Sequence, residues 1–292
     1  MNDRASTAVP GIEAATRAPV IPSRPLYYRH ALAVRVMHWI NVVALTIMLM
    51  SGLQIFNAHP ALYFGDQSYG GRPAWLEIGA KDGAQGNPVG YTRLFGHEFA
   101  TTGVLGLSTD DGRTYAQGFP SWLTLPSHQW LAMARSWHFF FAWIFVINGL
   151  SFIAYTIASR HLSRDLLPTR DDLRGIGTSI VDHLRFRHPT GEAAKRYNVL
   201  QKFAYLTVIF VLLPLIVLMG LGMSPRLDTL FGGWVAWFGG RQTVRSIHFI
   251  VAWALVAFVL VHVFEVIVTG FWNNLRSMIT GRYRVPRGSG HE

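Results

Sequence analysis

The 292-residue chain contains no cysteine, and charged residues make up only 14% of it. The absence of cysteine excludes disulfides, thiolate-bound iron–sulfur clusters, haem attached through CxxCH, thiolate zinc sites and thiolate nucleophiles. The glycine-rich GxGxxG and GxxxxGK[ST] loops that bind dinucleotides and nucleotide phosphates are also absent. Half of the residues are hydrophobic, which favours a small integral membrane protein over a soluble domain.

Four segments are long and apolar enough to cross the hydrocarbon core of a bilayer, which takes about 20 residues of helix. They lie at about 31–56, 137–158, 203–223 and 247–270. The sequence therefore predicts an all-α integral membrane protein, a four-helix transmembrane bundle within residues 28–280, with tails at 1–27 and 281–292. Because the first 30 residues lack the short apolar core of a cleavable signal peptide, we expect the first span to be retained as an anchor.

The formal net charge of +10 is distributed unevenly around these spans. Eighteen Lys and Arg residues lie before the first apolar core, between spans two and three, or after span four, and eight lie on the other side. The positive-inside rule then places both termini and the second connection in the cytoplasm. Since the excess charge is explained as a topology signal with attraction for anionic membrane lipid, no nucleic-acid partner is expected.

The first connection, at about 57–135, is the one large extramembrane piece and is predicted to be non-cytoplasmic. It is rich in Gly, Pro, Trp and Tyr, and its six acidic residues exceed its four basic residues before Arg135. This composition predicts a compact, largely irregular cap with short helices or a hairpin, and no separate enzyme domain. A docking surface and a passive lid over the bundle are both compatible with it.

Four histidines lie within the apolar segments, namely His38, His138, His248 and His262. An ionisable side chain within a span is unfavourable and indicates a functional site, and neutral imidazole is a haem-iron ligand. The 14 residues between His248 and His262 span about 21 Å of helix and leave the two side chains about 40° apart around its axis. These two histidines therefore lie on the same face of the helix, one in each leaflet of the bilayer.

With the amino terminus inside, His38 and His262 lie at the inner level, and His138 and His248 at the outer level. We predict that each pair ligates the iron of one haem b, so that the fourth span contributes to both. The alternative for each histidine is a buried imidazole hydrogen-bonded to a neighbouring helix. The other eight histidines lie in loops or tails, where a solvated surface role is expected.

Polar residues near these histidines suggest further roles. Arg35, Arg135 and Arg245 each precede a histidine by three residues, where a guanidinium can pair with a haem propionate or reach lipid headgroups. Glu265 follows His262 by three residues and is a candidate proton relay for a quinone, although it can also reach cytoplasmic water. For Asn41, an interhelical contact is favoured over a bond to quinone.

The number and spacing of these histidines resemble the bacterial di-haem cytochrome b561-type membrane subunits of formate dehydrogenase, nickel–iron hydrogenase and thiosulfate reductase. The resemblance covers about residues 28–280, and the segment Leu-Tyr-Phe-Gly-Asp at 62–66 is most similar to the thiosulfate-reductase-type group. It implies an inner-membrane electron-transfer subunit between the quinone pool and a periplasmic oxidoreductase, often a molybdopterin enzyme.

Two alternatives belong to other functional classes. The first is a stand-alone b561-type oxidoreductase that exchanges electrons between superoxide or a small oxidant and quinone. It is disfavoured because the loop is acidic before Arg135, whereas an anionic substrate would need a positive entrance. The second is a non-redox membrane transporter or assembly factor with structural histidines.

Overall fold

The computed structural model describes residues 26–69, 71–83, 86–160, 162, 167–185 and 198–284. Four helical segments in it are long and apolar enough to cross a membrane. They are α1 (Leu32–Asn57), α2 (Leu131–Ala158), the segment Val199–Gly222, and α8 (Arg241–Val268). The predicted four-helix architecture is thereby confirmed. Helices α2 and α8 begin six residues before the predicted spans at 137 and 247, because their amino-terminal turns project beyond the apolar runs.

The third segment is not one continuous α-helix. It consists of α5 (Val199–Thr207), a π-helical stretch (Val208–Leu212) and α6 (Leu213–Gly222), with Pro214 in the first turn of α6. Proline has no N–H to donate to the carbonyl four residues earlier, and both proline and π-helical turns interrupt the regular hydrogen bonding of a long helix.

The connection between α1 and α2 forms two antiparallel sheets. The first has the strand order β2 (Ala61–Leu62), β3 (Leu76–Asp82), β4 (Pro88–Leu94) and β5 (His97–Ala100), and the second pairs β6 (Gly106–Asp110) with β7 (Arg113–Gln117). The sequence predicted a largely irregular cap with short helices or a hairpin; antiparallel hairpins are present, and the strands are more extensive than that prediction allowed. The Gly and Pro residues on which it rested lie mainly in the turns between these strands and within β4.

The sheets are packed onto the end of α1. Leu53 and Phe56 of α1 share a buried cluster with Leu62, Leu76, Ile78 and Phe119. Burying a side chain of this size contributes roughly 1.5–3 kcal/mol. Asn57 extends the attachment, since its amide donates to the carbonyl of Phe119 (2.9 Å) and accepts from the Phe119 N–H (2.7 Å).

Smaller elements lie at both ends of the bundle. α3 (Arg170–Arg174) and α4 (Ile176–Leu184) follow α2, and α7 (Pro225–Leu230) follows α6. Helix α9 (Phe271–Thr280) follows α8. β1 (Leu26–Tyr28) pairs antiparallel with β8 (Arg282–Arg284) and joins the two ends of the described chain.

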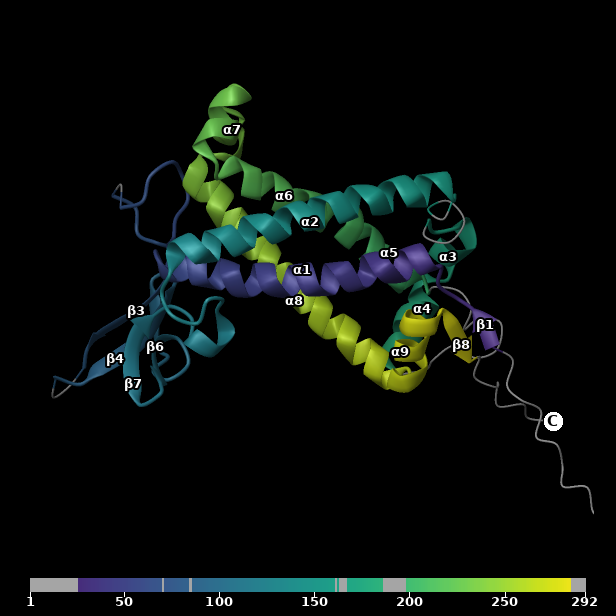
Figure 1. The fold of residues 1–292 in the computed structure, drawn as a ribbon, viewed down its shortest axis with the longest axis horizontal. Helices are drawn as coiled ribbons and strands as arrows, with labels where there is room; N and C mark the ends of the chain where they lie inside the picture. The colour runs from purple at the N-terminus through teal and green to yellow at the C-terminus, as the bar shows by residue number, and fades with distance from the viewer. Residues whose placement is uncertain are drawn as a thin grey trace, which may run out of the picture.

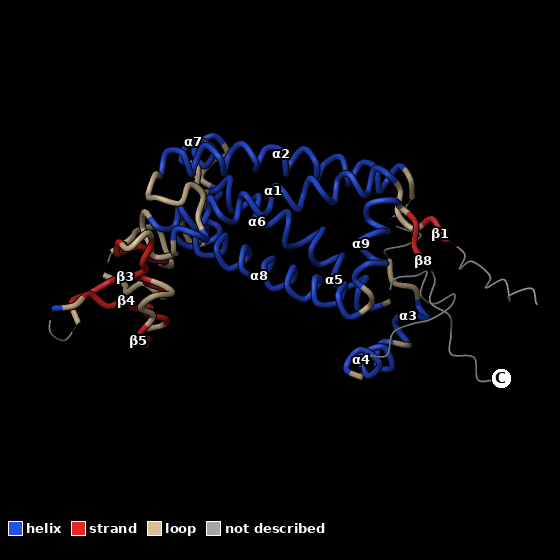
Figure 2. The backbone as a smooth tube through the Cα atoms, turned by 60° about the horizontal axis from the view of Figure 1, so that its bottom comes forward, coloured by secondary structure: helices blue, strands red, loops and turns tan. Residues whose placement is uncertain are grey.

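The bundle therefore has two different ends (Figure 1). The strands β2 to β7 lie at one, which we call the sheet end, and α9, β1 and β8 lie at the other, which we call the terminal end. The same separation is visible in the second view (Figure 2).

Candidate functional site

Two histidine pairs form between the helices, one towards each end of the bundle. At the terminal end, the ring centroids of His38 on α1 and His262 on α8 are 6.4 Å apart, with the ring planes at 55°. At the sheet end, the centroids of His138 on α2 and His248 on α8 are 6.3 Å apart, with the planes at 64°. The structure thus brings together the same partners that helix spacing and topology predicted.

The separation within each pair fits a single metal ion between two imidazoles. A metal–nitrogen bond of about 2 Å, with a ring centroid roughly 1 Å beyond the nitrogen, places the two centroids about 6 Å apart. No group of three or more His, Asp or Glu side chains able to hold a metal exists in the described part of the chain. Two imidazoles at this separation fit an iron whose other ligands come with it, as in haem, whose porphyrin supplies four nitrogens.

Both sheet-end histidines are fixed through Nδ1. His138 Nδ1 lies 3.0 Å from the carbonyl of Met48 and 3.2 Å from Ser51 Oγ, and His248 Nδ1 lies 2.9 Å from the carbonyl of Ile216. A carbonyl can only accept, so Nδ1 carries the proton and Nε2 keeps its lone pair for a metal. Such bonds also orient the ring and make it a more basic ligand.

A glycine accompanies each of these contacts. Met48 lies four residues before Gly52, and Ile216 lies four residues before Gly220. A Cβ atom at Gly52 would lie 3.3 Å from His138 Cε1, and one at Gly220 would lie 3.4 Å from His248 Cε1. In spans one and three, a glycine therefore leaves the backbone uncovered by a side chain, so that the histidine of the following span can approach it.

The terminal-end pair has a different environment. His38 Nδ1 is buried and has no hydrogen-bond partner among the described residues. The ring of Trp39 meets that of His38 edge-on, with centroids 5.4 Å apart, and Phe258 stacks on His262 at 6.0 Å. Aromatic packing surrounds this pair, whereas backbone carbonyls accept hydrogen bonds from the other.

Asn148 of α2 holds α1 beside His38. Its amide donates to the carbonyl of Met37 (2.9 Å) and to Asn41 Oδ1 (2.7 Å), and its side chain is buried. The interhelical contact favoured for Asn41 is confirmed. Neither Asn148 nor Ser51 was predicted from the sequence, although both are polar residues inside apolar spans, which is the same signal that identifies the histidines.

The three arginines have distinct contacts. Arg35 Nη1 donates to the carbonyl of Ile279 in α9, and Arg245 donates to the carbonyls of Ala61 (2.9 Å) and His59 (2.5 Å) at the sheet end. Arg135 is exposed, with its guanidinium 5.7 Å from the ring centroid of Phe139. Two of the arginines therefore connect segments outside the four spans to the bundle. Their pairing with haem propionates stays a prediction.

A four-helix bundle with two histidine pairs between its spans is the arrangement expected of a membrane cytochrome. The sequence model of the prokaryotic cytochrome b561 family matches residues 29–281, and the chain belongs to this family. The resemblance seen in the histidine pattern is thus confirmed. The protein is a multi-pass membrane cytochrome that binds haem b and transports electrons, and a non-redox transporter finds no support.

Two other proteins are similar to this chain in sequence. Over 245 residues, covering 82% of this chain and 91% of the relative, the chain is 28% identical to the putative protein-methionine-sulfoxide reductase subunit YedZ1 of Azospira oryzae. Over 157 residues, covering 49% of this chain, it is 29% identical to the probable Ni/Fe-hydrogenase B-type cytochrome subunit of Cupriavidus necator. The second match spans 64% of that relative's length.

Proposed function

We propose that this cytochrome carries two haem b groups and transfers electrons across the bacterial inner membrane, between the quinone pool at the terminal end and an oxidoreductase at the sheet end. The observation that carries the proposal is the presence of two histidine pairs, whose members on α8 are 14 residues or about 21 Å apart along the helix. Haem bound there supplies one-electron transfer. The contribution of the protein is to ligate, orient and shield two centres stacked along the membrane normal.

The names of the relatives support an oxidoreductase partner. One is described as a reductase subunit and the other as a hydrogenase cytochrome subunit, and both therefore serve a larger enzyme. In this chain the sheets β2 to β7 supply an extramembrane surface next to His138 and His248, which we assign to the partner side. A molybdopterin oxidoreductase is one such partner.

An apolar groove supports quinone binding at the terminal end. It measures about 600 Å³ and lies between α1, α2 and α9, within the usual size range of small-molecule sites. Its lining includes Arg35, Trp39, Ile40, Phe141, Ile144 and Met278. The apolar walls suit a quinone ring and isoprenoid tail, and Trp39, which lies on this groove, also contacts His38.

The proposed function predicts that a quinol will reduce the purified protein reconstituted in lipid vesicles. The reduced-minus-oxidised spectrum should show a b-type α band, and haem analysis should give two haems per chain. A preparation that contains haem but is not reduced by menaquinol or ubiquinol would remove quinone from the proposal and leave the family assignment intact.

Glu265 is proposed to pass a proton to or from the quinone. It is half-buried and lies one helical turn beyond His262. Glu265→Gln should slow quinol-linked reduction while haem content stays normal, because the amide keeps the size of the side chain but cannot take up a proton. Asp82→Asn, at the far end of β3, is the matched control and should not change the rate. Unaltered kinetics with several quinols would exclude Glu265 from the mechanism.

The proposed orientation can be tested with reporter fusions. A reporter joined after residue 110, at the end of β6, should be active as a periplasmic fusion, and one near residue 180, in α4, as a cytoplasmic fusion. The opposite pattern would exchange the inner and outer assignments of the two histidine pairs without changing their membership.

A further inference from the structure

Three aromatic rings form a column on the surface at the sheet end. Trp75 stacks between Phe64 and Phe95, with centroid distances of 5.8 and 5.6 Å, and we refer to Phe64, Trp75 and Phe95 as the aromatic column. Both end rings are open to the surroundings, since Phe64 is 46% and Phe95 68% exposed. Trp75 also packs against the buried cluster that joins the sheet to α1.

The column lies level with the start of an apolar span. Trp75 Nε1 donates to Ser246 Oγ at 2.9 Å, and Ser246 immediately precedes the apolar run of α8 that begins at Ile247. In a protein that spans the membrane, this level is the boundary between the headgroups and the hydrocarbon core. The strands β3 and β4 extend from this end away from the helices (Figure 1).

Phe95 is held in an unfavourable backbone conformation. It lies with Gly96 in the two-residue turn between β4 and β5, and both residues have positive φ, 48° and 84°. Such turns strongly favour Asn or Gly at the first position, and a bulky residue there is strained. Burial within the chain does not compensate the strain because the ring is mostly exposed. Strain of this kind at an exposed position suggests a role in contacts outside the chain.

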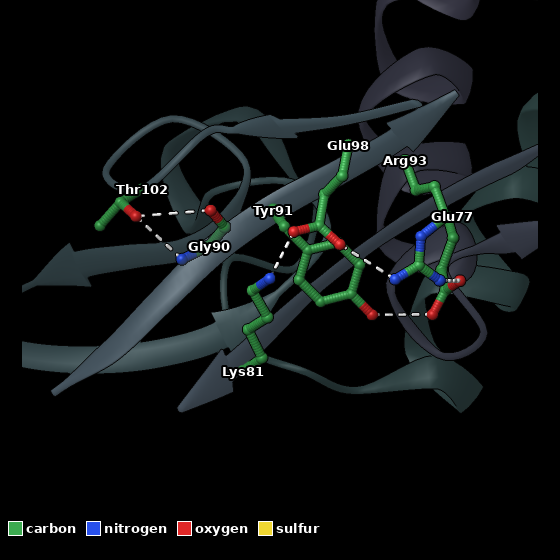
Figure 3. Close-up of polar contacts among 7 residues, drawn as sticks. All are labelled: Glu77, Lys81, Gly90, Tyr91, Arg93, Glu98 and Thr102. Carbon is green, nitrogen blue, oxygen red and sulfur yellow. Dashed lines mark hydrogen bonds and ion pairs between the residues drawn. The ribbon is translucent and has the colours of Figure 1, made fainter. Parts of the chain in front are cut away.

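The charges beside the turn neutralise one another. Arg93 bridges Glu77 (2.9 Å) and Glu98 (3.0 Å), and Lys81 pairs with the same Glu98 (Figure 3). Two acids and two bases thus form one network without net charge. Between this network and the turn lies the last strand pair, Leu94 with His97. The tip therefore carries the apolar side chains of Leu94 and Phe95 beside His97, and the network of paired charges lies next to it.

We propose that the aromatic column is inserted into the interfacial layer of the bilayer leaflet at the sheet end and anchors the extramembrane sheets to the lipid surface. Aromatic rings favour this layer, where their faces meet the acyl boundary while polar neighbours remain among the headgroups. The neutral charge network lowers the cost of bringing the sheet close to the headgroups. At this level a docked protein would have to displace lipid from the aromatic column, so we infer that the column contacts lipid. The proposal depends on the membrane assignment alone and on neither quinone nor partner.

The absence of cysteine makes this proposal directly testable. His97→Cys places a single thiol on an exposed residue beside Phe95 and leaves the column intact, whereas Asp82→Cys places one at the opposite end of the same sheet. Each full-length holoprotein is labelled with a small environment-sensitive fluorophore in lipid nanodiscs. The label at position 97 should be quenched several-fold more by lipids carrying a quencher near the headgroup than by aqueous iodide, and the label at 82 should show the reverse.

A second variant tests the role of the ring itself. Phe95→Asn in the His97→Cys background suits the positive φ and removes the aromatic ring. It should shift quenching from lipid towards iodide without loss of haem. Iodide quenching at position 97 as strong as at 82 would overturn the proposal. It would also be overturned if position 97 were shielded only after a partner protein is added, or if Phe95→Asn changed nothing, because these results assign the column to protein docking or to no contact.

Discussion

Replacing either histidine of one pair by alanine is expected to remove the same haem and to halve the haem-to-protein ratio. His138→Ala and His248→Ala should both lose the sheet-end centre, because an iron with one remaining protein ligand has lost half of its axial coordination. His38→Ala and His262→Ala should both lose the terminal-end centre. Pyridine haemochrome analysis measures the ratio, and redox titration identifies the centre that survives.

His97→Ala serves as the matched control for these four variants. This histidine is exposed on β5, away from both pairs, and its replacement should leave two haems per chain. Loss of one common centre in His38→Ala and His138→Ala would disprove the pairing. Retention of all haem in the four variants would disprove ligation by these residues altogether.

The helices and their histidines could be predicted because both depend on local pattern. About 20 consecutive apolar residues identify a span without knowledge of its neighbours. The helical repeat then places His248 and His262 on one face of α8, and the order of the spans across the membrane selects their partners. No side-chain packing had to be known to predict which histidines meet.

The sheets could not be predicted in the same way because their pairing is long-range. β4 contains Pro88 and Gly90, which are residue types depleted in strands, and β2 has only two residues. What stabilises these strands is the β3–β4 register, from Leu76 opposite Leu94 to Asp82 opposite Pro88. Strands β2 and β3 also pack on Leu53 and Phe56 of α1, and neither interaction has a signature within a short window of sequence.

The hydrogen-bond partners of the histidines could not be predicted from the sequence either. The carbonyls of Met48 and Ile216 orient His138 and His248, and a backbone carbonyl is the same in every residue. The one sequence feature associated with these hydrogen bonds is the pair of glycines, Gly52 and Gly220, which allow the rings to approach the backbone. The contacts of the arginines could not be predicted for a different reason. A guanidinium can donate to a propionate, to a lipid headgroup or to a backbone carbonyl, and the fold determines which of these acceptors is within reach.

Arg245→Ala is expected to loosen the sheet end from the bundle. The guanidinium donates to the carbonyls of Ala61 and His59 and lies 5.9 Å from the ring of Phe56. A hydrogen bond from a charged donor contributes about 1.5–3 kcal/mol. Loss of about 3 kcal/mol would raise the open population of β2 and its neighbours on the order of 100-fold, which amide hydrogen exchange in nanodiscs detects. Arg135→Ala, which removes an exposed guanidinium near Phe139, should leave the exchange of β2 unchanged.

The same variant distinguishes the two roles considered for Arg245. As an attachment of the sheet, its loss should accelerate exchange in β2 and β3 while the midpoint potential of the sheet-end centre changes little. As a partner of a haem propionate, its loss should shift that potential and leave exchange unaltered, because a nearby positive charge favours the reduced state of the iron.

The pKa of His59 gives a third readout. Burial lowers the pKa of His59 and the charge of Arg245 lowers it further, so in Arg245→Ala this pKa should rise towards its usual value. An unchanged pKa together with unchanged exchange would show that the two hydrogen bonds from Arg245 do not hold the sheet in place.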